Sequence, residues 1–166
     1  MIEDLGTIIE RYIRNTTPFE RVSKIMEFVD AYLSIQKTCY ADDIRIERDI
    51  AEDIEDEIIP TFLLQPLVEN AIVHGLLRKP GGGTLRIEGR RSGSDLIFTV
   101  EDDGTGMTEE ARRELYQRNS GEHGNGFYNV DRRIKLFCGE EYGLTVVTVP
   151  GKGTKIQARI KGGLAG

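Results

Sequence analysis

Apolar residues recur at helical spacing along the first forty positions. The i, i+3, i+4, i+7 repeat starts at Leu5, and it returns at Val22 and continues for three turns. Between the two stripes, residues 17–20 (TPFE) are typical of a helix cap, with Pro18 at the first helical position and Glu20 closing a capping box. We therefore expect two amphipathic helices joined by a short turn, packed on each other, on the next module or on a second copy of the chain.

The remaining pattern predicts a sheet interleaved with helices. The expected strands are residues 44–50, 84–91, 96–101, 144–149 and 154–160, and the expected helices are 62–77, a short one from Thr108, and 127–137. Turn-forming residues at 92–95 and 150–153 pair the last four strands as two hairpins. Residues 52–57 and 117–126 are expected to be loops, the first acidic and solvated. This order predicts an α+β fold: a two-layer sandwich in which helices cover one face of a mixed sheet, with an N-terminal helical appendage.

Composition narrows the class of protein. A length of 166 residues suits one domain, and a net charge of −6 argues against a general basic footprint for nucleic acid or an anionic membrane, although a local basic patch is compatible with it. No apolar run approaches the length of a transmembrane helix, and the first residues do not resemble a signal peptide, so we expect a cytoplasmic location. Cys39 and Cys138 have no zinc or disulfide spacing, and we expect two reduced thiols.

The first motif with candidate chemistry is residues 65–75 (QPLVENAIVHG), within the expected helix 62–77. Asn70 and His74 are four positions apart and share a helix face. Polar groups in so apolar a helix need partners. The pattern fits either a binding site or a buried asparagine satisfied by the backbone.

The second motif, residues 102–107 (DDGTGM), follows a predicted strand. An ionised Asp102 can only accept hydrogen bonds, which suits an exocyclic amine such as that of adenine. Gly104 and Gly106 allow the backbone to approach a flat ring closely. An ordinary Asp-Gly turn is the alternative.

The third motif, residues 121–130 (GEHGNGFYNV), is a glycine-rich loop that opens into a helix. Free amides and the positive end of the helix dipole make such a loop an anion cradle. It lacks the lysine of a P-loop, and no strand immediately precedes it as in a dinucleotide-binding turn, so neither of those phosphate-binding folds is supported.

In this order, the three motifs resemble the N box and the two glycine boxes of the GHKL ATPase superfamily, in particular those of LytS-type sensor histidine kinases. The matching stretches are residues 65–71 with His74 and Gly75, Asp102-x-Gly104-x-Gly106, Gly124-x-Gly126 with Asn129 and Val130, and Gly151-x-Gly153-Thr154. Upstream, residues 11–12 and 32–36 are similar to that family's second dimerisation helix and connector. The resemblance implies a Bergerat fold. It divides the chain into the end of a dimerisation region (1–40), an ATP-binding catalytic domain (41–161) and a tail (162–166).

The resemblance also implies where the nucleotide would bind. Asp102 would accept a hydrogen bond from the adenine amino group, and Gly104 and Gly106 would shape the pocket floor. Residues 121–126 would form the ATP lid, whose amides reach the phosphates. The other implied nucleotide-binding residues are Gly124, Gly126, Asn129 and Thr154.

Three side chains of the N box would carry the chemistry implied by the resemblance. Asn70 would hold Mg²⁺, an ion that prefers oxygen ligands and bridges phosphates. Glu69 would order the water shell of the metal or polarise a water, and His74 would lie beside them. Catalysis of this kind depends on positioning and on charge neutralisation around the transferred phosphoryl group.

The chain departs from the family pattern at several positions. Val73 stands where many relatives carry a phosphate-contacting lysine, for which Arg78, Lys79, Arg132 or Arg133 are possible substitutes. Pro66 stands where the superfamily's ATPases use a carboxylate, which argues against simple ATP hydrolysis as the main activity. Glu122 and Asn125 are unusual in the second glycine box.

The sequence contains two histidines, both in the implied nucleotide site, so the phospho-acceptor histidine of the family is not among them. We expect a fragment of a longer sensor kinase or a natural truncation. The leading function is transfer of the ATP γ-phosphoryl group to a histidine on a missing helix of a homodimer, with a response regulator as the next partner. An anti-sigma-type serine kinase and a non-catalytic nucleotide-sensing module are the alternatives. No nucleic acid is expected, and a membrane only through other segments.

Overall fold

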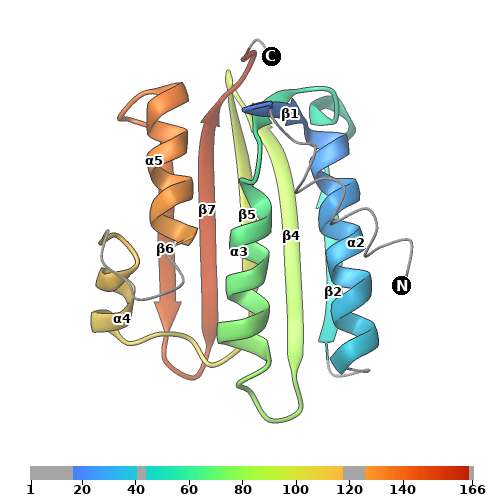
Figure 1. The fold of residues 1–166 in the computed structure, drawn as a ribbon. Coiled ribbons are helices and arrows are strands. Elements are labelled where there is room, and N and C mark those ends of the chain that lie inside the picture. The colour runs from blue at the N-terminus through green and yellow to red at the C-terminus, as the bar shows by residue number, and fades with distance from the viewer. Residues whose placement is uncertain (1–16, 41–43, 118–125, 165–166) are drawn as a thin grey trace.

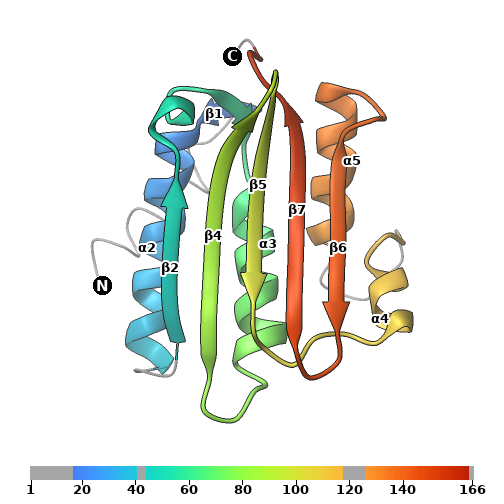
Figure 2. The same ribbon diagram turned by 180° about the vertical axis from the view of Figure 1, so that it is seen from behind.

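The predicted two-layer architecture is confirmed. The computed structural model describes residues 17–40, 44–117 and 126–164. Figure 1 shows helices α2, α3 and α5 lying along one face of a sheet, and Figure 2 shows the opposite face with its strands uncovered. The expected helix that begins near Leu5 lies outside the described residues.

The sheet has five strands in the order β2-β4-β5-β7-β6. Their bounds are β2 Ile44–Ile50, β4 Gly83–Ser92, β5 Asp95–Asp102, β6 Gly143–Val149 and β7 Gly153–Lys161. Both predicted hairpins, β4 with β5 and β6 with β7, are confirmed. β2 and β4 are parallel, which requires a crossover between them, and the long connection carries α3 across the sheet.

The helices follow the predicted pattern with one change. They are α2 Val22–Tyr40, α3 Leu64–Asn70, α4 Glu109–Glu114 and α5 Gly126–Cys138. The second half of the expected helix 62–77 widens into a π-helix, η3 (Ala71–Leu76). The Thr108 hydroxyl caps α4 by accepting the Ala111 amide at 3.2 Å, as predicted. None of the described helices is long and apolar enough to cross a membrane.

One hydrophobic core lies between the sheet and the helices. Leu67, Val68 and Ile72 of the central helix are buried in it. Sheet residues Leu85 and Phe98 belong to the same core. The apolar stripe of α2 also belongs to it, so this helix packs on the sheet, one of the arrangements that its stripe allows. Assignment of residues 1–40 to a dimerisation region stays a prediction.

The predicted helix cap at residues 17–20 is wrong. Phe19–Arg21 forms a short strand, β1, which pairs with β3 (Ile58–Pro60), and the helix begins at Val22. The first amides of α2 are instead satisfied by distant carbonyls: Val22 N donates to Glu57 O and Ser23 N to Glu55 O, both at 3.0 Å. A helix whose orphan amides are taken by another segment needs no local cap.

The acidic segment, residues 52–57, has a structural role that its charge did not indicate, because two of its carbonyls accept the first amides of α2. Most of its carboxylates are exposed, as predicted, but Ile54 within it is fully buried in a short 3₁₀ turn, η2 (Glu52–Ile54). Arg91 pairs with both Asp53 and Glu57. These contacts bind the segment to the sheet and fix the carbonyls that cap α2.

The uncovered face of the sheet carries charged side chains that alternate with buried ones. Along β7, Lys155 and Arg159 face outward, whereas Ile156 is buried. Ion pairs join neighbouring strands across this face, including Arg86 with Glu47 and Lys155 with Glu101. This alternation explains why helices cover only one side.

Helix α5 packs on the sheet through apolar residues of the core, and one buried carboxylate adds hydrogen bonds to this contact. Asp131, 5% exposed, accepts the Leu144 amide of β6 at 2.8 Å through Oδ1. Its Oδ2 accepts Lys135 Nζ at 2.6 Å. On the other side of the helix axis, Arg133 Nη1 donates to Thr61 O at 2.6 Å. These bonds set the position from which the start of α5 reaches the candidate site.

We expect Asp131→Ala to lower the free energy of unfolding by about 2 kcal/mol, because it leaves a buried strand amide without an acceptor. Urea unfolding followed by circular dichroism measures the change. Asp131→Asn keeps one acceptor oxygen and should lose clearly less. Equal stability of the alanine variant and the wild type would contradict this account of α5.

Candidate functional site

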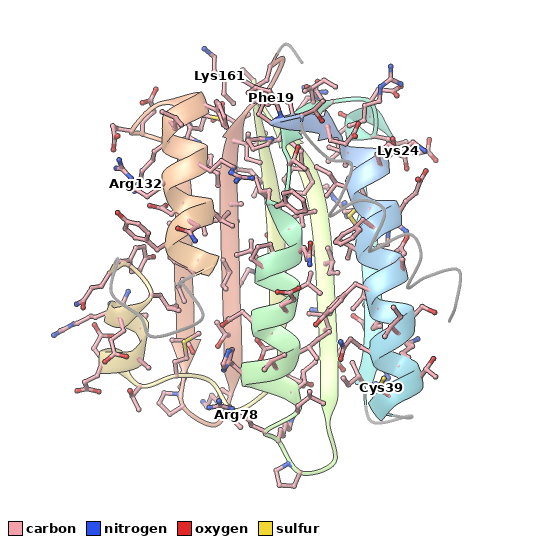
Figure 3. All side chains as sticks on the ribbon, viewed as in Figure 1. Phe19, Lys24, Cys39, Arg78, Arg132 and Lys161 are labelled. Atoms are coloured by element: carbon pink, nitrogen blue, oxygen red, sulfur yellow. The ribbon has the colours of Figure 1, made fainter. Side chains whose placement is uncertain are left out.

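The first two predicted motifs meet at one end of the molecule. β5 ends at Asp102, which pairs in register with Thr154 at the start of β7. The π-helix ends at the same edge, whereas α5 begins farther up the helical layer, beside the first turn of α3 (Figure 1). Figure 3 shows Arg78 just beyond the π-helix, at the end opposite Phe19 and Lys161. Three segments far apart in the sequence thus meet around the end of β5.

The Asp102 carboxylate is the most buried charged group of this region, with 4% of the residue exposed. Burial raises its pKa to about 6; the Gly104 and Thr154 amides act in the lowering direction and the neighbouring Asp103 charge in the raising one. The Gly104 amide donates to Oδ1 at 2.9 Å. At neutral pH the group is therefore mainly an ionised, poorly solvated acceptor, which gains by meeting a further donor.

Two glycines allow this carboxylate to lie against the N box. A Cβ at Gly75 would lie 2.5 Å from Asp102 Oδ1, and one at Gly104 would lie 2.4 Å from the Gly75 carbonyl carbon. Thr105 completes the junction, since its amide donates to Gly75 O at 3.3 Å and its hydroxyl to His74 O at 3.2 Å. The first and second motifs are thus joined by direct contact, as parts of one site would be.

The second hairpin closes on the same junction. Gly106 has φ +64° and lies so near β6 that a Cβ would be 2.1 Å from Val149 O. The Gly151 amide donates to Thr105 O at 2.7 Å. Thr148, which the sequence analysis missed, accepts the Met107 amide at 2.9 Å and contacts the buried Thr154 hydroxyl at 3.0 Å. A lone threonine in an alternating strand gives no motif by which it could have been found.

The N box presents the remaining predicted side chains. Glu69 and Asn70, at the end of α3, are partly exposed, and His74 is exposed on the π-helix. Partial burial lowers the His74 pKa, and the positive charge of Arg78 lowers it further, so both effects favour the neutral imidazole. Gln65 Nε2 donates to Glu69 Oε1 at 2.7 Å.

The π-helix changes the register of these side chains. Leu77 N bonds to Ile72 O at 2.9 Å, five residues back, in place of the i−4 partner of an α-helix. The sequence gives no local signal for this widening.

The start of α5 adjoins helix α3. A Cβ at Gly126 would lie 3.2 Å from Pro66 Cβ, one turn before Asn70. Asn129 lies exposed in the first turns of α5. No hydrogen bond within the described ranges joins Glu69 or Asn70 to Asp102. Gly124, and with it Glu122, His123 and Asn125, lies outside the described residues.

Of the four cations considered as substitutes for a lysine at position 73, two are engaged elsewhere. Lys79 Nζ donates to Asp103 O at 2.7 Å, and Arg133 binds Thr61 O. Within the parts of the chain that the structure describes, Arg78 and Arg132 make no hydrogen bond or ion pair. Val73 itself is 44% exposed, which leaves space for a longer side chain.

Comparison with known proteins agrees with this geometry. Residues 55–163 match the family described as histidine kinase-, DNA gyrase B- and HSP90-like ATPase. The chain is 35% identical over 156 residues to YwpD of Bacillus subtilis, covering 90% of this chain and 55% of that protein. It is 29% identical over 160 residues to the sensor histidine kinase BtsS of Escherichia coli, covering 96% and 27%. The chain thus spans between a quarter and just over half of these relatives.

Solved structures agree on the fold. The histidine kinase AdeS of Acinetobacter baumannii has a TM-score of 0.66 at 18% identity, covering 98% of this chain and 77% of that one. The histidine kinase domain of a blue-light activated histidine kinase from Erythrobacter litoralis has a TM-score of 0.65 at 20% identity, covering 96% and 72%.

The buried state of Asp102 gives a pH dependence of stability. Its pKa is raised from 3.8 to about 6, so the folded protein holds this proton more tightly than the unfolded chain. Relative to Asp102→Asn, the wild type should therefore lose about 2.4 kcal/mol of unfolding free energy as the pH rises from about 4 to about 7. Urea unfolding of both proteins over this range measures the difference. Parallel stability curves would contradict the burial of a titrating carboxylate.

Proposed function

The chain belongs to the histidine kinase-, DNA gyrase B- and HSP90-like ATPase family, and we propose that it is the ATP-binding catalytic domain of a sensor histidine kinase. It would transfer the γ-phosphoryl group of ATP to a histidine on a helix outside this chain. The observation that carries the proposal is the buried Asp102 carboxylate, held against Gly75 and Gly104 at the meeting point of the first two motifs. A response regulator and a second copy of the kinase would be its partners in the cytoplasm.

Asp102 is suited to recognise adenine. Its buried carboxylate would accept a hydrogen bond from the adenine amino group, which returns part of the solvation lost on folding. Gly104 and Gly106 pack directly against Gly75 and Val149, so their role would be to let the backbone close up and shape the pocket floor beside Asp102. Thr154 would act through its amide, which supports the ionised form of Asp102.

The N box is suited to the phosphates. Mg²⁺ bound with a nucleotide needs only one or two protein oxygens, because the phosphates and waters supply the rest. Asn70 offers one such oxygen from a partly exposed position, and within the described residues no cluster of three or more ligating side chains competes for the ion. When bound there, Mg²⁺ would neutralise phosphate charge. The amides at the start of α5, near Gly126, and the lid that includes Gly124 would contact the phosphates.

The neutral His74 and the partly exposed Glu69 would act beside the phosphates. Glu69 would order or polarise water, and His74 would line the site without adding positive charge. Since His74 and His123 belong to the proposed nucleotide site, the acceptor histidine would lie on another segment of the dimer. Residues 1–40 would be the end of the region that presents it.

One observation favours a second candidate. Val73 leaves the exposed position beside the N box without a cation, which would weaken phosphate binding. A nucleotide-sensing module that binds ATP without transferring its phosphate would tolerate this loss. Phosphate transfer, not binding alone, therefore separates the two functions.

Two measurements test the proposed function. Titration calorimetry should detect Mg-ATP binding, and Asp102→Asn should weaken it roughly 10- to 100-fold by removing a charged acceptor. Asn70→Ala should reduce the affinity for ATP to the value that the wild type shows when a chelator removes Mg²⁺. When this chain is joined to a dimerisation helix that carries the proposed acceptor histidine, label from γ-³²P-ATP should appear as acid-labile, base-stable phosphohistidine. Binding without phosphohistidine would favour the sensing module, and no binding at millimolar ATP would overturn both.

We expect Val73→Lys to tighten ATP binding roughly two- to fivefold, because an exposed ammonium beside the phosphates adds a modest attraction. Val147→Lys adds the same charge on the uncovered face of β6, where Val147 is 67% exposed, and should leave the affinity unchanged. Competition with a fluorescent nucleotide measures both. An equal gain in the two variants would show only a general effect of charge.

A further inference from the structure

Gln65 is a buried polar side chain directly before the proposed catalytic residues. It is 5% exposed and stands one helical turn before Glu69, to which its amide donates at 2.7 Å. We propose that Gln65 is a positioning residue that fixes the Glu69 carboxylate for phosphoryl transfer. The inference rests on the proposed function and deepens it, because it assigns a residue that acts through Glu69 without touching ATP.

The burial of Gln65 has an energetic cost that packing does not require. Its neighbours along α3, including Leu64, Leu67 and Val68, are buried and apolar, and an apolar side chain of similar volume would fill the same space. A primary amide taken from water loses free energy unless it forms hydrogen bonds. The bond to Glu69 joins two residues of one helix, so it does not hold α3 to the sheet.

The bond is of a kind that orients a carboxylate strongly. An amide donor at 2.7 Å to an ionised oxygen is a charge-assisted hydrogen bond, stronger than one between neutral groups. A free glutamate samples many rotamers, and holding one oxygen removes most of that freedom. Within the described ranges, the other carboxylate oxygen, Oε2, has no donor. Gln65 thus fixes the side chain by one oxygen and leaves the second available beside Asn70.

The proposal predicts a loss of turnover without a loss of ATP binding. When this chain is joined to a dimerisation helix that carries the proposed acceptor histidine, Gln65→Met should lower kcat for autophosphorylation roughly 10- to 100-fold, the effect typical of losing an outer partner of a reacting group. KM for ATP should stay within about twofold, since Asp102 and Asn70 are unchanged. Gln157→Met makes the same chemical change at an exposed position on the uncovered sheet face and should leave kcat unchanged.

A double-mutant cycle separates positioning from a purely structural role. If Gln65 acts only through Glu69, then Gln65→Met should have no further effect on kcat in a Glu69→Ala background. A full additional loss in that background would overturn the proposal, as would wild-type kcat in either single variant. Urea unfolding checks that each variant is folded at the assay temperature.

Gln65→Glu tests the same idea independently if the methionine variant fails to fold. The introduced carboxyl can donate to Glu69 only when protonated, so kcat relative to the wild type should rise as the pH falls from about 8 to about 6. Asp102 and His74 titrate in both proteins and cancel in this ratio. A ratio that does not change with pH would overturn the inference. An inactive wild-type kinase would instead refute the proposed function, and the inference with it.

Discussion

The site depends on a close approach between one carboxylate and two glycines. Asp102 ends β5 in a buried position, and only the missing side chains of Gly75 and Gly104 let the N-box helix reach it. The same junction receives Thr105 from one loop and, through Gly151, the turn of the second hairpin. The amides of Gly104 and Thr154 offset only part of the cost of burying the charge, and a donor from a ligand would offset more of it.

Local chemistry in the sequence predicted most of the elements. Both hairpins followed from their turns, and the capped start of α4 followed from Thr108. Long-range contacts explain the failures. The cap at residues 17–20 was wrong because carbonyls more than thirty positions away, in Glu55 and Glu57, satisfy the helix, and neither the strand order nor the π-helix has a local signal.

In the candidate site, too, some residues could be found from the sequence and others depend on long-range contacts. The motifs singled out Asp102, Asn70 and the glycines as candidates, because their residue types and order are specific. Thr148 and Gln65 were not singled out, since a strand threonine and a helix glutamine become meaningful only when their partners are seen. The roles of Glu69, Asn70 and His74 stay proposals, and the tests above address the first two directly.

The two hairpins form from neighbouring residues, whereas the pairings of β2 with β4 and of β5 with β7 join distant parts of the chain. The N box lies in the first of these long connections, and both glycine motifs lie in the second. Closing long loops makes such pairings slow steps of folding. A nucleotide held by both connections would therefore bind only after the sheet is fully assembled. Its binding would stabilise the two long-range strand pairings, which form last.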